Sequence, residues 1–380
     1  MPEKTRESVI INHADLTQLS TDILVAANVS RNEAERVAAR LVGADLTDHS
    51  SHGVGRLPRY VQMLEQGLVF AGRTISIVTQ SEAHLVLDGN AGFGQAIGED
   101  AVRAGCAHAA RHGVAVVGLR NSGHLGRIGD WAEMAAEAGY VSIHMVSVRG
   151  RSLVAPYGGI DRRLATSPFA AGVPITGSAP LVLDFATSAV SEGKALMAAK
   201  GGTPLPPGSL ISPEGLPSHD PSDLYGSTVN EPVPNASIGS GALAAFGGHK
   251  GSGLSFMIEI LAGALTGTGV NRTHFDGEEK PFRNGMLSIY LDPDRFAGRD
   301  YLESEARNWA VYLRSARPAV GHDAVLIPGE QETRHRANRI KNGVPLTGQA
   351  WQGLVRLAEG LGLNTDDYAA TVRTEPSPDS

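Results

Sequence analysis

Residues 84–98 read HLVLDGNAGFGQAIG, a strand-like run followed by a glycine-rich turn and the start of a helix. A Rossmann fingerprint has a third small residue three places after its second glycine, and an acidic residue at the end of the next strand. Here Gly98 comes one place late, and the next strand ends in Arg120-Asn121. The stretch therefore predicts an α/β fold that is not a Rossmann fold.

Strand and helix patterns alternate through the middle of the chain, on both sides of this stretch. Strands are expected at residues 75–78, 84–87, 114–117, 140–148 and 181–183, and helices at 96–110, 128–138 and 251–265. Both ends of the chain show helical spacing, including about 302–315 and 348–361. We predict the α/β (α+β) class, with a helical domain from residues 1–74 and 297–380 and an α/β domain from 75–296. Residues 201–239, rich in Pro, Gly and Ser, are expected to form a long loop.

Composition excludes several classes of protein. The 380 residues carry a formal net charge of −7 and no dense basic run, so we expect no nucleic-acid partner. One cysteine, Cys106, excludes an intramolecular disulfide framework and fits a reducing compartment. The first ten residues do not resemble a signal peptide, and the longest apolar run, 254–265, is too short to cross a bilayer. We therefore expect a cytoplasmic protein with no membrane partner.

The run Ser51-His52-Gly53 with Arg56 is the first candidate site. A loop histidine beside a glycine can exchange a proton with a substrate oxygen, because its pKa is ordinarily near 6.5. An arginine four residues on can grip a carboxylate through two parallel hydrogen bonds. Two alternatives stay open: a capping histidine with a surface arginine, or half of a zinc site formed by His49 and His52.

Two further candidate regions are loops next to expected helices. Arg120 to Arg127 (RNSGHLGR) lies between a strand and a helix, where backbone amides can bind a phosphate or carboxylate. Gly247 to Gly253 (GGHKGSG) joins glycines, a lysine and a helix N-terminus, without the spacing of a P-loop. The alternatives are a capped turn in the first case and a glycine-rich loop without ligand in the second.

Asp184 ends an expected apolar strand, in the run LDFATS. A carboxylate there is partly removed from water and needs a partner, and a histidine is one common partner. The alternative is that Asp184 caps the helix that follows.

Taken together, these motifs resemble the malate/L-lactate dehydrogenase family of the non-Rossmann type. The resemblance runs almost end to end and rests on the Ser51 to Arg56 run, the Asn121 to Gly126 run, Asp184 with Ala-Thr-Ser, and Lys250-Gly251. Within the family, the runs His124 to Gly129, Val141 to His144 and Val154 to Pro156 are most similar to the hydroxycarboxylate dehydrogenases.

The resemblance implies an NAD(P)-dependent oxidoreductase that interconverts 2-oxo and 2-hydroxy acids. It implies an atypical, largely antiparallel cofactor-binding sheet and a homodimer with active sites near the subunit interface. It assigns His52 as the acid/base, Asp184 as its partner and Arg56 as the carboxylate ligand, with Ser51 and Arg127 as further substrate contacts. The cofactor contacts that it implies are Asn121, Ser122, His124, Gly126, Thr166, Ser167, Pro168, Ala186, Thr187, Ser188, His249, Lys250 and Gly251. No metal is expected.

Several alternatives remain within and beyond this resemblance. An imine reductase acting on cyclic or N-alkyl 2-imino acids would use the same cofactor and carboxylate clamp. Two alternatives come from other functional classes: a metal hydrolase that uses His49 and His52, and a nucleotide sensor without catalytic activity. Arg149 and Arg151 could meet the 2′-phosphate of NADP, although the resemblance favours NAD.

Overall fold

The computed structural model describes residues 6–199, 204–229, 235–236, 238–271, 281–368 and 370–375. Its internal contacts divide the chain into two units, Met1–Arg73 with Gly329–Ser380, and Thr74–Pro328. Helix α9 (Arg299–Arg314) belongs to the second unit, whereas the sequence analysis placed it with the first. Among the described residues, no helix is both long enough and apolar enough to cross a membrane.

The first unit combines helices with a small antiparallel sheet. Its helices are α1 (His13–Ala26), α2 (Arg31–Leu46), α3 (Leu57–Glu65), α10 (Glu330–Asn342) and α11 (Gly348–Gly360). Its sheet has the order β12-β1-β13, formed by β12 (Val344–Thr347), β1 (Arg6–Ile11) and β13 (Ala370–Glu375). Neither the sheet nor α10 was predicted from the sequence, and α10 has no buried residue to give it an apolar stripe.

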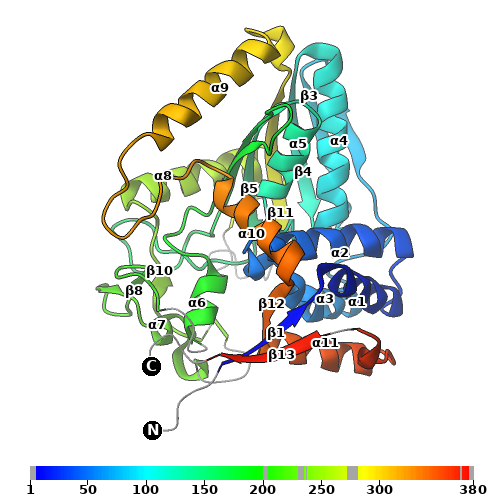
Figure 1. The fold of residues 1–380 in the computed structure, drawn as a ribbon, viewed down its shortest axis with the longest axis vertical. Helices are drawn as coiled ribbons and strands as arrows, with labels where there is room; N and C mark the ends of the chain where they lie inside the picture. Colours follow the sequence, from blue (N-terminus) through cyan, green and yellow to red (C-terminus); the bar gives the residue numbers. More distant parts are fainter. Residues whose placement is uncertain are drawn as a thin grey trace. The chain divides into compact units, whose positions relative to one another are not determined.

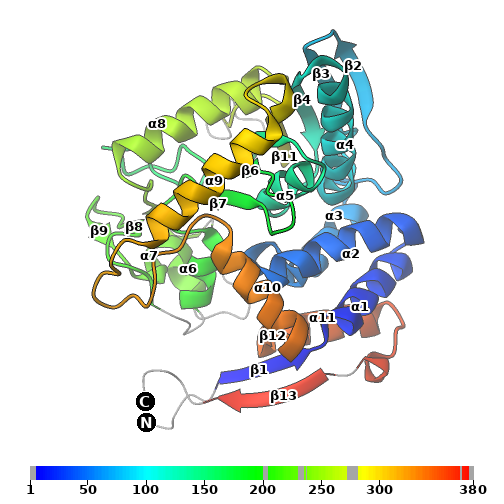
Figure 2. The same ribbon diagram turned by 45° about the horizontal axis from the view of Figure 1, so that its top comes forward.

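The second unit is built on a seven-stranded sheet with the order β2-β3-β4-β11-β5-β6-β7 (Figures 1 and 2). The strands are β2 (Ser76–Gln80), β3 (His84–Asp88), β4 (Val114–Ser122), β11 (Arg283–Leu291), β5 (Val141–Arg149), β6 (Phe169–Val173) and β7 (Leu181–Phe185). Among the seven described strands of this sheet, only β3 and β4 pair in parallel. The prediction of an α/β, non-Rossmann, largely antiparallel sheet is confirmed, although β6 and β11 were not anticipated.

Alternating side chains of the sheet build a core on each of its faces. Val146 and Met286 pack with helices α4 (Gly94–His112) and α5 (Gly129–Glu137) on one face. Their neighbours Met145 and Leu287 face the other way, toward α8 (His249–Ile258) and the π-helical turn η4 (Glu259–Ala264) that continues it. This two-sided burial explains why strands at the centre of the sheet are apolar on both faces.

A smaller subdomain with its own apolar core lies beside the sheet. It contains α6 (Glu192–Ala199), β8 (Leu210–Ile211), β9 (Pro217–Ser218), α7 (Pro221–Tyr225) and β10 (Ala242–Leu243). The expectation of one long loop over residues 201–239 is therefore wrong for its described part, while 201–203, 230–234 and 237 lie outside the described residues. Arg162 stabilises the subdomain by donating to the backbone carbonyl oxygens of Leu224, Gly239 and Gly241.

Candidate active site

The His52 turn follows helix α2 in the first unit. Two 3-10 turns, Ser50–His52 and Val54–Arg56, join α2 to α3. The His52 side chain is half-buried, and its Nδ1 lies 3.0 Å from Oγ of Ser51. This hydrogen bond fixes the orientation of the imidazole ring, as a group that exchanges protons requires.

Arg56 is anchored to the same turn by one nitrogen of its guanidinium. Its Nε donates to the backbone carbonyl of Ser51 at 2.6 Å. The two terminal nitrogens of Arg56 make no hydrogen bond or ion pair with a described residue. These terminal groups are therefore available to a carboxylate, which a guanidinium binds through two parallel N–H donors.

Asp45, which the sequence analysis did not select, lies beneath the His52 turn. Its Oδ2 accepts a hydrogen bond from the backbone N–H of Val54 at 2.8 Å, and the Ser50 side chain also donates to the carboxylate. Asp45 is 1% exposed, and burial raises its pKa to about 7. One signal was present in the sequence, because Asp45 interrupts the apolar run around Leu41, Val42 and Ala44 on α2.

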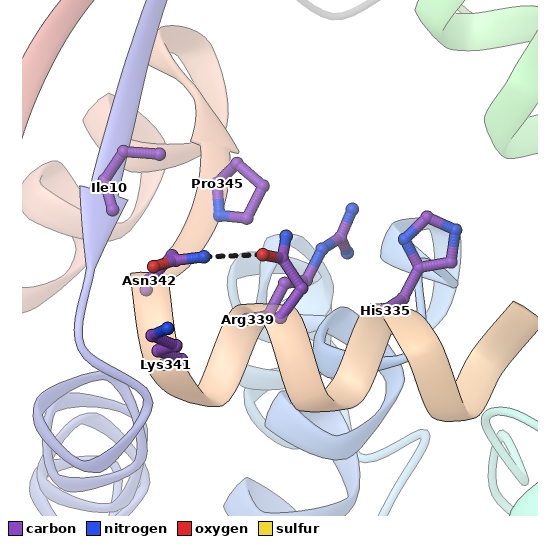
Figure 3. Close-up of a pocket in the computed structure, with 8 residues that line it drawn as sticks. Ile10, His335, Arg339, Lys341, Asn342 and Pro345 are labelled. Atoms are coloured by element: carbon purple, nitrogen blue, oxygen red, sulfur yellow. Dashed lines mark hydrogen bonds between the residues drawn. The ribbon is translucent and has the colours of Figure 1, made fainter.

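Arg339 of helix α10 contacts the segment before this turn and also lines a hollow on the first unit. Arg339 donates to the backbone carbonyl of Asp45 and to the carboxylate of Asp48. The hollow has a volume of about 640 Å³ and is shown in Figure 3. Its lining is Ile10, His335, Asn338, Arg339, Lys341, Asn342, Gly343 and Pro345. None of the site residues predicted from the sequence lines it, so its position gives no support to their chemistry.

The metal reading of His49 and His52 finds no support in the structure. The Nδ1 atom of His49 lies 3.0 Å from the backbone carbonyl of Thr47. In the described part of the chain, no three His, Cys, Asp or Glu side chains are grouped so that they could hold a metal ion.

Asp184 lies near the end of β7 in the second unit, opposite Ala170 of β6. Its Oδ2 accepts a hydrogen bond from the backbone N–H of Gly129 at 2.9 Å, at the start of α5. The Nε atom of Arg127 lies 3.7 Å from the same oxygen. Asp184 therefore faces a helix N-terminus and a guanidinium, both of which favour its ionised form.

Arg127 does not have the open surroundings that a substrate contact would lead one to expect. The residue is 2% exposed, and its guanidinium pairs with Asp130 and Glu133 at 2.9 Å each. The substrate contact inferred for Arg127 stays a prediction, and its surroundings suit an internal role better.

Three loops that carry predicted cofactor contacts are hydrogen-bonded to one another. The N–H and Oγ1 of Thr187 both donate to the carbonyl of Thr166, at 2.8 and 2.9 Å. The N–H of Phe246, just before the loop of Lys250, donates to the carbonyl of Thr187 at 3.0 Å. These hydrogen bonds link Thr166 and Thr187 to each other and to Phe246, which precedes the start of α8 at His249.

Backbone geometry in these loops suits a ligand held close to the main chain. Gly247 and Gly248 have φ values of +55° and +62°, which place a side-chain-free turn before α8. Ser167 is buried and has a φ of +29°, a conformation that side chains other than glycine rarely adopt. His249 and Lys250 are exposed beside this turn. Exposed cationic and backbone donors of this kind fit the pyrophosphate of a dinucleotide.

The fourth predicted group, Asn121 to Gly126, begins with the last two residues of β4 and continues into the loop after it. The side chain of Asn121 donates to Asp88 at 3.1 Å and accepts from Arg283 at 2.9 Å, with its φ at +53°. A Cβ atom at Gly94 would lie 2.0 Å from the carbonyl oxygen of His124. The loop is thus packed against the first turn of α4, and Ser122 and Gly126 are buried while His124 is half-buried.

Comparisons with known proteins identify the family of the chain. The family model described as malate/L-lactate dehydrogenase matches residues 11–355. The chain belongs to the malate/L-lactate dehydrogenase family.

Individual members of the family match nearly the whole chain. The sequence is 38% identical over 341 residues to hydroxycarboxylate dehydrogenase B of Escherichia coli, covering 89% of this chain and 90% of that protein. It is 37% identical over 349 residues to L-lactate dehydrogenase of Cupriavidus necator, covering 91% and 96%. The solved structure of malate dehydrogenase from Pyrococcus horikoshii matches with a TM-score of 0.82 and 28% identity, covering 94% and 97%. The resemblance of the sequence to this family, and to the hydroxycarboxylate dehydrogenases within it, is confirmed.

Proposed function

We propose that this protein is an NAD(P)-dependent dehydrogenase that interconverts small 2-oxo acids and 2-hydroxy acids. The observation that carries the proposal is the family match over residues 11–355, joined to the Ser51-His52-Gly53 turn with its oriented imidazole and its anchored Arg56. The relatives named above act, by their names, on hydroxycarboxylates, lactate and malate. Imine reduction is not favoured by them.

Each polar group of the site takes one task in this proposal. In the oxidative direction, the neutral imidazole of His52 accepts the proton of the 2-hydroxyl group, and in the reductive direction it returns that proton. Arg56 binds the 1-carboxylate through its terminal nitrogens, with Ser51 holding both Nδ1 of His52 and Nε of Arg56. Asp184 stabilises the imidazolium, as its ionised state allows.

The nicotinamide cofactor, when bound, accepts or supplies the hydride at the 2-carbon. Residues of the interlinked loops would hold it, with Thr166, Thr187 and the 247–251 turn as the principal contacts. NAD is the preferred form in this proposal. Arg151 is paired with Glu192, and Nη1 of Arg149 donates to the carbonyl of Thr268, so both arginines already have partners within the protein.

We also propose that the protein is a cytoplasmic homodimer. Helix α9 supports the dimer, because four of its apolar side chains are at least 60% exposed: Tyr301, Trp309, Val311 and Tyr312. The single cysteine, Cys106, supports the location, because it fits a reducing compartment.

The test is a substrate panel assayed by NADH and NADPH absorbance. Malate, lactate and 4-hydroxyphenyllactate, with their 2-oxo counterparts, should give turnover for at least one pair. Pyruvate with methylamine is the comparison arm, and turnover far above that of pyruvate alone would move the assignment to imine reduction. Absence of any absorbance change across the panel would contradict the proposal.

A further inference from the structure

Arg127 is a buried cation next to Asp184, and two carboxylates of the helix that follows it fix its place. Its Nη1 donates to Oδ1 of Asp130 and its Nη2 to Oε1 of Glu133, each at 2.9 Å. Both carboxylates belong to the first turns of α5. Two of the three guanidinium nitrogens are thus held in place without Asp184.

The third nitrogen faces Asp184. Nε of Arg127 lies 3.7 Å from Oδ2 of Asp184, beyond hydrogen-bond distance, and this buried atom has no hydrogen-bond partner among the described residues. The same oxygen already accepts from the N–H of Gly129. Burying an N–H donor without a hydrogen-bond partner is unfavourable. The pairing of Arg127 with Asp130 and Glu133 does not explain why its Nε is buried facing the carboxylate of Asp184.

Gly129 is what allows this approach. A Cβ atom at position 129 would lie 2.8 Å from Oδ2 of Asp184 and 2.9 Å from Nη2 of Arg127. Any side chain there would push the carboxylate and the guanidinium apart. The lack of a side chain at Gly129 therefore allows Arg127 and Asp184 to lie close together at the start of α5.

The charges around the cluster keep Arg127 cationic. Burial disfavours the charged guanidinium, but Asp130, Glu133 and Asp184 outweigh burial and raise the pKa of Arg127 above its usual range. Of the elements packed against β7, strand β6 carries no titratable side chain, and α5 carries Asp130, Glu133 and Glu137. Neither element carries a cation, whereas Arg127, just before α5, faces Asp184 with a permanent positive charge.

We propose that Arg127 is a positioning residue, which holds the carboxylate of Asp184 ionised and fixed in direction rather than binding substrate itself. This inference rests on the proposed function, in which Asp184 stabilises the acid/base histidine. If Asp184 acts on the histidine in this way, a cation next to Asp184 would partly offset its negative charge, and the pKa of the imidazole would be lower than without that cation. Removing that cation should raise the pKa of the acid/base group.

The experiment compares variants that differ at Arg127 alone. Asp130→Asn with Glu133→Gln gives a background in which loss of the arginine leaves no unpaired carboxylate on α5. Arg127 is kept, or replaced by Met, or by Lys in this background, and kcat and kcat/KM for oxidation of the best hydroxy acid are measured from about pH 5 to pH 10. Dissociation constants for NADH are measured in parallel by fluorescence.

We expect Arg127→Met to move the pH midpoint of kcat/KM upward by roughly half a unit or more. We expect kcat to fall by roughly tenfold to a hundredfold, the range in which a displaced catalytic geometry lies, with NADH affinity unchanged. Arg127→Lys, which keeps the charge, should restore most of the pH midpoint. Equal midpoints and equal kcat in the arginine and methionine variants would overturn the inference.

Failure of the proposed function and failure of a variant to fold can both be told apart from failure of this inference. If the wild type turns over no 2-hydroxy acid, the proposed function fails, whatever the variants do. If Arg127→Met does not fold, Arg127→Gln in the same background takes its place, since glutamine keeps polar contacts without charge. The same upward shift is then expected, and its absence would contradict the role of Arg127.

Discussion

The backbone N–H of Val54 donates a hydrogen bond of 2.8 Å to Oδ2 of Asp45, so a buried carboxylate of α2 holds the turn that presents His52. The carboxylate lies directly against Gly53, where a Cβ atom would be 2.0 Å from Oδ1 of Asp45. Asp45 thus holds the backbone of the turn, while the hydroxyl group of Ser51 orients the imidazole of His52.

Gly53→Ala should damage the turn, because the added methyl group overlaps the Asp45 carboxylate. We expect unfolding to become easier by roughly 1–3 kcal/mol, as for other overpacked buried sites, and kcat to fall. Gly55→Ala is the matched control, because its Cβ would meet only the Cβ of Ala350, at 4.0 Å. Urea unfolding and steady-state kinetics measure both effects. Equal stability and kcat in the two alanine variants would show that Gly53 is not constrained.

Asp45 should make stability depend on pH. Burial raises its pKa from the usual value of 3.8 to about 7, so between these values the folded state binds more protons than the unfolded state. Stability from this group is therefore present at low pH and declines as pH rises from about 4 to about 7. At about 1.4 kcal/mol for each pKa unit, the decline is at most roughly 4 kcal/mol.

Asp45→Asn tests this dependence, because asparagine keeps an oxygen acceptor for Val54 but does not ionise in this range. We expect the free energy of unfolding of the variant to fall less than that of the wild type between about pH 4 and about pH 8. Asp48→Asn, at an exposed position of the same segment, serves as the control. Parallel curves for wild type and Asp45→Asn would contradict the assignment.

Arg56→Lys should weaken substrate capture more than it slows the chemical step. A lysine cannot reproduce the two parallel donors of the guanidinium, so we expect KM for the hydroxy acid to rise by roughly tenfold or more, with a smaller change in kcat. Arg59→Lys, on the exposed face of α3, should leave both constants unchanged. If KM is nearly unchanged in Arg56→Lys, the carboxylate of the substrate is bound by another cation.

Cofactor preference should favour NADH, and Arg149 and Arg151 should have little part in it. Both arginines already contact the protein, Arg149 through Thr268 and Arg151 through Glu192. We expect the Arg149→Ala/Arg151→Ala double variant to keep the wild-type ratio of kcat/KM for NADH over NADPH. A wild type that prefers NADPH by more than about tenfold, with the preference lost in the double variant, would make them phosphate ligands.

The local patterns of the sequence predicted much of the second unit but not its order. The strand predicted at residues 84–87, the turn at Gly94 and helix α4 could be predicted, because apolar spacing and the positions of glycines are local signals. Strand β11 was missed, although it lies between β4 and β5 at the centre of the sheet. Its place depends on pairing with strands more than 130 residues earlier, which no local pattern encodes.

In the candidate site, too, some residues could be predicted from local sequence and others could not. His52, Arg56 and Asp184 were chosen from residue types and neighbours in sequence, and the family resemblance added the cofactor loops. Asp45 and the Arg127 cluster were not predicted, because their meaning lies in burial and in which carboxylate each group faces. Arg127 illustrates this best, since the family resemblance implies a substrate contact and its surroundings suit an internal charge.

The most direct test of the central claim is the reduction of 2-oxo acids by NADH or NADPH in the wild type and in His52→Ala, with cofactor binding measured separately by fluorescence. We expect turnover by the wild type. For His52→Ala we expect a loss of roughly a hundredfold to ten-thousandfold in kcat, with cofactor affinity retained. A wild type that turns over no 2-oxo or 2-hydroxy acid, or a His52→Ala variant with wild-type kcat, would contradict it.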